Sequence, residues 1–292
     1  MERKELLGDA SAAVNIPMSE AVDLWSTDPD RAEQLAEQAW QAIPEPREQW
    51  LNAGPEVAGS AAEGELSVGR HEAAAKWLER YREVADPDNR DEQASYWALV
   101  GRLSLAMDLP RQAVAALDRE VELNGYFYEL SDHLPVLAKY RELKGLPVVR
   151  MPAPWAESGP RPPEELGESA LAQLQTIYDE AAGLDDQEQH REALAVWEGA
   201  WDVIPAPTQE WSWSATIHGG MGESLYWLED YPMAELAFQF AMRCPGGEQP
   251  VGFARLAQSV EKGRGDKKLA EEFWAEAEPA HPGIRELANE ED

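Results

Sequence analysis

The chain repeats itself, and this repeat limits what it can fold into more than any other feature. Residues 39–50 read AWQAIPEPREQW and residues 200–211 read AWDVIPAPTQEW, with six identities in twelve positions. The same offset of 161 positions, applied without a gap, also aligns Trp77 with Phe238. Two tryptophans and two prolines in register are hard to obtain by chance, so we interpret the pattern as an ancient duplication. The fold should therefore contain two related halves.

Helical periodicity fills the sequence between these motifs. Apolar residues recur at spacings of three and four, as in Ala193, Val196, Trp197 and Ala200, which is typical of one face of an amphipathic helix. Alanine and leucine far outnumber the β-branched residues, a balance that favours helix over strand. Prolines and glycines punctuate the periodic runs and limit each helix to about 10–18 residues. The sequence therefore predicts an all-α protein.

A proline-rich stretch divides the chain nearly in half. Six prolines fall between positions 147 and 163, where they would interrupt any helix. We predict a first half over residues 1–143, a linker over 144–168 and a second half over 169–292.

A shorter pattern lies inside each half. Residues 221–241 carry a small residue, Gly222, then a turn, and then Ala234, Phe238 and Ala241 at helical spacing. Related copies occupy residues 97–117 and 256–277. This pattern resembles the tetratricopeptide (TPR) repeat, a helical hairpin in which small residues allow close helix packing and an aromatic residue fills the gap between hairpins. The resemblance implies a TPR-like α-α superhelix of about five to six hairpins in two duplicated halves.

The net charge limits the classes of molecule that we expect the protein to bind. The chain has 56 acidic and 25 basic residues, a net charge of −31. Such a surface repels the phosphates of nucleic acids and anionic membranes, so neither is expected as a partner. Residues 151–292 carry −19 of this charge and residues 1–150 carry −12. Because a field of this sign speeds encounter with positively charged proteins, we expect one basic protein partner.

Other features indicate a cytoplasmic protein. The chain has a single cysteine, Cys244, and its first residues contain no apolar core of a signal peptide. It also lacks a run of ~18 apolar residues that could span a membrane. The sequence leaves the oligomeric state open.

Motifs that would indicate an enzyme, a metal site or a cofactor site are missing. The histidines are scattered without zinc-ligand spacing, and neither a phosphate-binding loop nor a nucleophile elbow occurs. The run from His218 to Gly222 is similar to a glycine-rich oxyanion loop, but we interpret its small residues as helix-packing positions. The five histidines are His71, His133, His190, His218 and His281. We therefore predict no catalytic residue, no metal and no cofactor.

Tryptophans at periodic positions are expected in the core, namely Trp40, Trp77, Trp197, Trp201 and Trp274. In TPR proteins the first helices of the hairpins line the concave surface, so the resemblance implies that exposed residues there bind the partner. Aromatic and charged side chains are the usual hot spots of such surfaces. The predicted partner-binding residues are Arg102, Trp211, Trp213, Glu223, Tyr226, Trp227, Gln258 and Glu261.

The second half also resembles the TPR-type predicted immunity proteins of bacterial polymorphic toxin systems. The similarity rests on residues 192–207 (EALAVWEGAWDVIPAP), on Trp211, on the turn at Asp230, on residues 243–246, on Pro250 and on residues 255–258. The first half shares only the element from Trp40 to Pro46. An immunity role is therefore implied for the second half alone.

These inferences lead to a functional hypothesis. We expect a non-enzymatic, protein-binding TPR scaffold, which on the second resemblance is an immunity protein that neutralises a basic toxin. The alternative is a regulatory or chaperone-like adaptor that recognises a peptide segment. An enzyme is the third class, and turnover that depends on one carboxylate would identify it.

Overall fold

The computed structural model describes residues 3–51, 53–124, 134–152 and 166–290. Those residues form helices, two short 3₁₀ turns and one isolated β-bridge between Lys4 and Trp50. The prediction of an all-α protein built from TPR-like hairpins is confirmed. The chain divides into two compact units, which we call unit 1 (residues 1–124 and 135–146) and unit 2 (residues 125–134 and 147–292).

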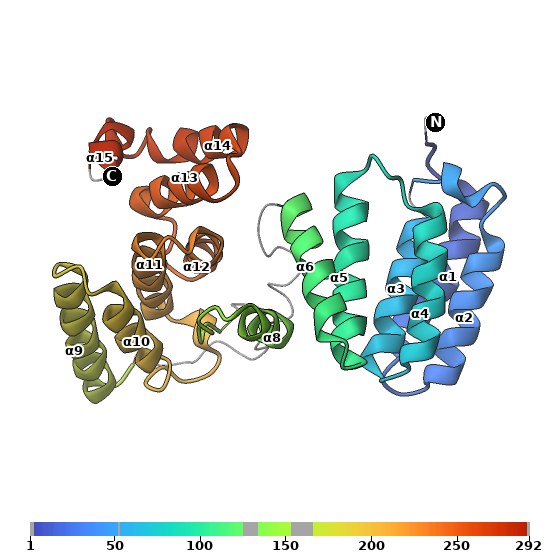
Figure 1. Ribbon diagram of the computed structural model, residues 1–292, viewed down its shortest axis with the longest axis horizontal. Coiled ribbons are helices and arrows are strands. Elements are labelled where there is room, and N and C mark those ends of the chain that lie inside the picture. The colour runs from blue at the N-terminus through green and yellow to red at the C-terminus, as the bar shows by residue number, and fades with distance from the viewer. Residues whose placement is uncertain (1–2, 52, 125–133, 153–165, 291–292) are drawn as a thin grey trace. The chain divides into compact units, whose positions relative to one another are not determined.

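Unit 1 contains three antiparallel helical hairpins, which follow one another along the chain (Figure 1). A further helix, α8 (Leu134–Lys144), lies beside α6, where the Tyr140 hydroxyl donates to Asp118 at 2.6 Å. The hairpins pair α1 (Gly8–Leu24) with α2 (Pro29–Ala42), α3 (Gly54–Ser67) with α4 (His71–Val84), and α5 (Arg90–Ala106) with α6 (Pro110–Asn124).

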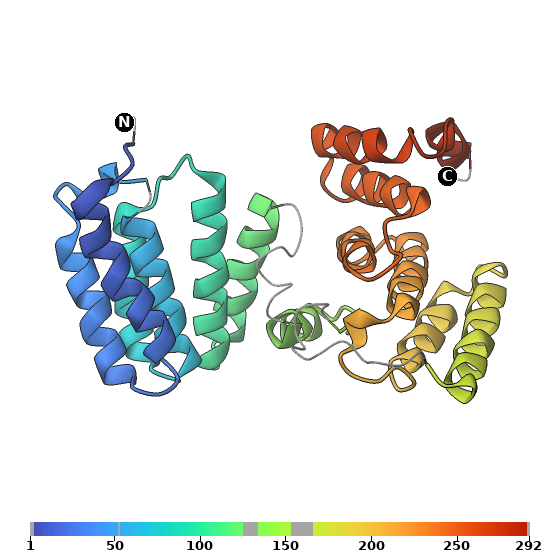
Figure 2. The same ribbon diagram turned by 180° about the vertical axis from the view of Figure 1, so that it is seen from behind.

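Unit 2 repeats this plan and adds a short last helix, α15 (Ile284–Glu290). Each second helix contacts the first helix of the next hairpin, and Figure 2 shows the three pairs in chain order. The hairpins pair α9 (Glu168–Asp185) with α10 (His190–Ala200), α11 (Ser212–Trp227) with α12 (Tyr231–Arg243), and α13 (Pro250–Arg264) with α14 (Lys267–Ala277).

Prolines begin several helices. Pro29, Pro55, Pro232 and Pro250 occupy the first or second helical position, where the missing N–H costs no hydrogen bond. Helix α13 ends at Gly265, whose φ of 66° is the left-handed conformation that glycine adopts without strain. The proline and glycine signals in the sequence therefore mark the ends of these helices.

Small residues allow the close helix packing that the TPR pattern predicts. A Cβ atom on Gly222 would lie 2.7 Å from the Phe238 ring of the same hairpin. A Cβ atom on Gly220 would lie 2.2 Å from Trp197 of the preceding hairpin. The five tryptophans expected in the core are all buried, so that prediction is also confirmed.

The repeated sequence motif builds the same loop in both units. A 3₁₀ turn follows a cis proline in each, at η1 (Arg47–Gln49) and η2 (Thr208–Glu210). The indole N–H of Trp50 donates to the Pro44 carbonyl at 2.8 Å, and Trp211 makes the matching bond to Pro205 at 2.9 Å. The duplication is thus visible in the structure as well as in the sequence.

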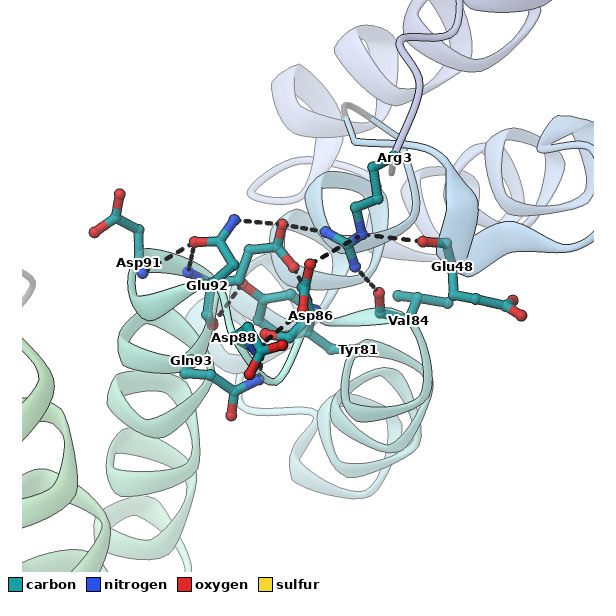
Figure 3. A network of polar contacts seen from close by, with 10 residues as sticks. Arg3, Glu48, Tyr81, Val84, Asp86, Asp88, Asp91, Glu92 and Gln93 are labelled. Atoms are coloured by element: carbon teal, nitrogen blue, oxygen red, sulfur yellow. Dashed lines mark hydrogen bonds and ion pairs between the residues drawn. The ribbon is translucent and has the colours of Figure 1, made fainter. Parts of the chain in front are cut away.

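Arg3 holds the first residues of unit 1 against the turn between α4 and α5 (Figure 3). Its side chain is 9% exposed and forms an ion pair with Glu92, and it also donates to the carbonyls of Glu48 and Val84. Glu92 in turn accepts the backbone N–H of Asp86 at 2.8 Å. Because a buried arginine needs such partners, this network fixes Arg3 in a structural role.

The predicted linker contains no helix at residues 145–152 and 166–167, its end residues Lys144 and Glu168 belong to α8 and α9, and residues 153–165 lie outside the described residues. The last boundary between the units falls between Leu146 and Pro147, inside that linker, and the division of the chain into a first half over 1–143 and a second half over 169–292 stays a prediction. None of the helices in the described part of the chain is long and apolar enough to cross a membrane.

Candidate functional site

Unit 2 contains an open groove with a volume of ≈ 680 Å³. Its walls come from the end of α9, the start of α10, one face of α11, the loop after α12 and the start of α13. The volume falls within the range of ~300–1,000 Å³ that is typical of ligand-binding clefts. This groove is the candidate functional site.

Helix α11 supplies the floor. Thr216, Gly219, Gly220, Glu223 and Trp227 line the groove, and their spacing of three and four places them on one face of the helix. Gly219 has open space where a Cβ would project. Gly219 therefore leaves open space in the groove, and Glu223 and Trp227 follow further along the same face of the helix.

An arginine anchors the α13 wall. Arg255 is 7% exposed, and its Nε donates to both carboxylate oxygens of Glu223 at 3.0 Å. Its guanidinium lies 5.2 Å from the Tyr226 ring and 5.5 Å from the Trp227 ring, within the range of cation–π attraction. The charge of Arg255 is thus matched by Glu223, and its position is set by two aromatic rings.

A second polar cluster forms the opposite wall. His190 Nδ1 lies 2.9 Å from Asp185, and the imidazole stacks on Trp227 with an interplanar angle of 17°. The Ser224 hydroxyl donates to Asp185 at 3.1 Å and to the Gly220 carbonyl at 3.2 Å. This hydroxyl donates to a carboxylate and a carbonyl rather than to an imidazole, so it does not form the serine–histidine pair of an activated serine nucleophile.

Trp227 therefore lies between two charged clusters. One of its neighbours is His190 and another is Arg255, and the indole remains 37% exposed. Asp186, on the groove rim, is also exposed, and its carboxylate has no hydrogen-bond partner among the described residues. The groove thus offers an aromatic edge and a carboxylate to an incoming group.

The structure brings only two of the predicted partner-binding residues, Glu223 and Trp227, into the groove. Tyr226 and Gln258 are 2% and 3% exposed, so the expectation that they are exposed on the concave surface is wrong. Arg255 covers the ring of Tyr226, which lies on α11. The side-chain amide of Gln258, on α13, donates to the Ala288 carbonyl of α15, so this helix covers it.

The remaining predicted residues lie elsewhere. Arg102 is in unit 1, where it pairs with Glu63 at 2.8 Å. Trp211 and Trp213 are half-buried at the start of α11, and Glu261 is exposed on α13. Their role in binding stays a prediction.

Sequence reasoning missed the residues from α9, α10 and α13. Tyr178, Asp185 and His190 come from the first hairpin of unit 2 and Arg255 from the third, and all four line the groove. The one available signal was Arg255, because an arginine within an apolar helical run is rarely buried without a partner.

Other titratable groups of unit 2 are buried in its core. Burial lowers the pKa of His218 to about 3, and the ring packs 4.6 Å from Trp201. Burial raises the pKa of the Cys244 thiol to about 11, and its Sγ lies 3.4 Å from the Phe240 carbonyl. The described residues contain no cluster of three metal-ligating side chains.

Comparisons with known proteins identify no family. No family model and no curated protein matches the chain. Among solved structures, the chain is similar to the TPR2AB-domain:pHSP90 complex of yeast Sti1, with 15% identity over 96% of both chains and a TM-score of 0.36. The assignment of a TPR-like fold therefore stands on the hairpin packing described above, and the resemblance to immunity proteins stays a prediction.

Proposed function

We propose that the protein is a non-enzymatic scaffold and that the groove of unit 2 binds a segment of one basic protein partner. The observation that carries this proposal is the groove itself, in which the exposed edge of Trp227 lies beside acidic side chains. Aromatic anchors are the residues that most often dominate binding energy at protein interfaces.

Charge supports a basic partner. Glu223 is matched by Arg255, whereas Asp185 and Asp186 line the groove without a second lysine or arginine among the described lining residues. The groove therefore has an excess of negative charge, within the more acidic half of the chain. Such a surface favours lysine and arginine side chains and disfavours acidic ones.

Gly219 provides a direct test. A Cβ atom at this position, which lines the groove, would meet no atom within 4 Å, and the same holds for Gly199 on α10, which lies outside the groove. Gly219→Lys and Gly199→Lys change the net charge by the same amount. We expect Gly219→Lys to weaken binding of a fluorescein-labelled octalysine peptide at least about tenfold more than Gly199→Lys does, which corresponds to about 1.4 kcal/mol.

Fluorescence anisotropy at two salt concentrations measures this difference. Gly219→Gln separates blocking from charge, because its side chain is neutral and of similar length. Equal affinities of the Gly219→Lys and Gly199→Lys proteins would contradict the proposal, because binding would then be spread over the acidic surface.

The finer form of the proposal is an immunity role, supported by the resemblance of the second half and by its charge of −19. Co-expression with a toxin encoded by a neighbouring gene should then restore bacterial growth. Gly219→Lys should abolish this protection and Gly199→Lys should retain it. Failure of the unsubstituted chain to bind any neighbouring gene product would rule out the immunity role and leave the adaptor, whose partner would be encoded elsewhere.

A further inference from the structure

Gln258 occupies a buried position between the groove and the last helix. Its Oε1 accepts Arg255 Nη1 at 2.9 Å, and its Nε2 donates to the Ala288 carbonyl of α15 at 2.9 Å. Arg255 continues the chain of contacts to Glu223 and to the Trp227 ring. One amide thus connects α15 to the aromatic edge of the groove.

Helix α15 depends on docking for its stability. It has seven residues, and isolated helices shorter than about 12–15 residues are marginal in water. Two of its own residues, Ile284 and Ala288, are buried, and its Arg285 pairs with both carboxylate oxygens of Glu271 on α14. Short helices that dock through few buried residues open at lower free energy than the core does.

We infer that Gln258 is a positioning residue that couples the docking of α15 to the geometry of the groove. When α15 is docked, the Ala288 carbonyl orients the amide, the amide orients Arg255, and Arg255 fixes Trp227. When α15 leaves, the amide loses its acceptor and the guanidinium loses a fixed neighbour. The groove is then less well ordered, and binding to it costs more conformational entropy.

This inference deepens the proposed function, on which its relevance to binding rests, but the contacts themselves can be tested without a partner. The chain has twelve tryptophans, so 5-fluorotryptophan labelling gives a resolvable set of ¹⁹F resonances. The Trp227 resonance is assigned by its loss in Trp227→Phe. We expect Gln258→Met, and separately deletion of residues 284–292, to shift and broaden that resonance.

Two further variants divide the chain of contacts. Gln258→Glu keeps the acceptor for Arg255 but lacks the donor for Ala288, so it should move the Trp227 resonance less than Gln258→Met does. Val260→Ala removes methyl groups from a fully buried position of the same helix and should leave the resonance in place. A purely structural role of Gln258 predicts equal shifts for Gln258→Met and Val260→Ala, and would overturn the inference.

Deletion of α15 without a change at Trp227 would overturn the coupling, whatever Gln258→Met does. If Gln258→Met does not fold, Arg285→Glu replaces it, because a carboxylate beside Glu271 weakens the docking of α15. A stationary Trp227 resonance in that variant would count against the inference in the same way.

The octalysine probe then separates the two proposals. Loss of ordering should weaken its binding to Gln258→Met about fivefold or more, a typical coupling between sites. A shift of the Trp227 resonance in a protein that never binds the probe would support the coupling and contradict the proposed function.

Discussion

Unit 1 buries the helix face that unit 2 leaves open. By the offset of 161 positions, Gly219 and Glu223 of α11 correspond to Ala58 and Ala62 of α3. Both alanines are completely buried, whereas Gly219 faces open space and Glu223 lines the groove. Two helices of common origin can therefore present either a packed face or a binding face.

A second difference between the two units concerns a bulky residue. Trp25 of unit 1 is 5% exposed and packs against Gly64, where a Cβ would lie 2.1 Å from its ring. Its counterpart in unit 2 is Asp186, which is exposed on the groove rim. An indole packed in the core of unit 1 thus corresponds to an exposed carboxylate at the groove of unit 2.

The units also use a buried arginine differently. Arg3 and Arg255 both have 9% exposed side chains that pair with a glutamate. The partners of Arg3 include the Glu48 and Val84 carbonyls, which fasten one segment of chain to another. Arg255 instead contacts two aromatic rings beside the groove. The same chemistry thus supports the fold in unit 1 and the candidate site in unit 2.

The largest predicted contrast concerns Trp25 and Asp186. Trp25→Ala should lower the free energy of unfolding by about 3–5 kcal/mol, the usual cost of truncating a buried tryptophan. Asp186→Ala, at the equivalent exposed position, should change it by less than about 0.5 kcal/mol. Urea denaturation monitored by circular dichroism measures both, and similar values for the two variants would contradict the difference in packing.

A second contrast concerns pH. Glu65 of unit 1 is fully buried, neither carboxylate oxygen has a hydrogen-bond partner in the described structure, and burial raises its pKa to about 7 from 4.5. Between these values the folded state holds a proton that the unfolded state lacks, so the free energy of unfolding falls as pH rises. Glu65→Gln should remove this decline, as measured by denaturation at pH 5 and pH 8.

Unit 2 contains two buried titratable groups that change the free energy of unfolding in opposite directions as pH rises. Its His218, with a pKa lowered to about 3 from 6.5, contributes stability that is lost as pH falls below 6.5. Burial raises the pKa of Glu235 to about 7, which gives the opposite slope. His218→Phe should therefore stabilise the protein more at pH 4 than at pH 8, and an equal effect at both values would contradict the neutral, buried state of the imidazole.

A third contrast uses two glycines at equivalent positions. Gly220→Ala should destabilise the protein by about 1–3 kcal/mol because of overpacking, since its Cβ would meet Trp197. At Gly59 a Cβ would lie 3.9 Å from Tyr81, an ordinary contact. Gly59→Ala should therefore stabilise α3 by about 0.5–1 kcal/mol, the difference in helix propensity. Thermal denaturation should show opposite signs.

The smallest difference is expected in the shared loop. Trp50→Phe and Trp211→Phe each remove one indole hydrogen bond to a proline carbonyl. Each should cost about 0.5–1.5 kcal/mol, the net value of one such bond, and the two costs should agree. A clear inequality in denaturation midpoints would show that the two loops are not equivalent.

Local patterns predicted the fold because they act within one hairpin. The duplicated motif, the prolines at helix starts and Gly222 opposite Phe238 all depend on neighbours close in sequence. The site depends on contacts between hairpins. Asp185 and His190 contact each other within one hairpin, but they line the same groove as Arg255 only after the three hairpins have stacked, and helical periodicity does not reveal that register.

Tyr226 shows the same limit. Tyr226 lies on a first helix, α11, and this helix lines the groove. Whether Tyr226 or Trp227 is exposed depends on the rotation of α11 about its axis. The ring of Tyr226 is covered by Arg255 and Lys262, which come from the next hairpin. The resemblance to a repeat family identifies the helix that lines a surface but not the side chain that reaches it.

Cys244 has a practical consequence for spectroscopy. It is the single cysteine of the chain, it is buried, and its raised pKa keeps the thiol protonated at neutral pH. Thiol-reactive dyes attack the thiolate, so a cysteine introduced at position 219 or 199 should be labelled selectively without removal of the native one. The protein therefore accepts a fluorophore or spin label inside the groove, or at a matched position outside it, through a single substitution.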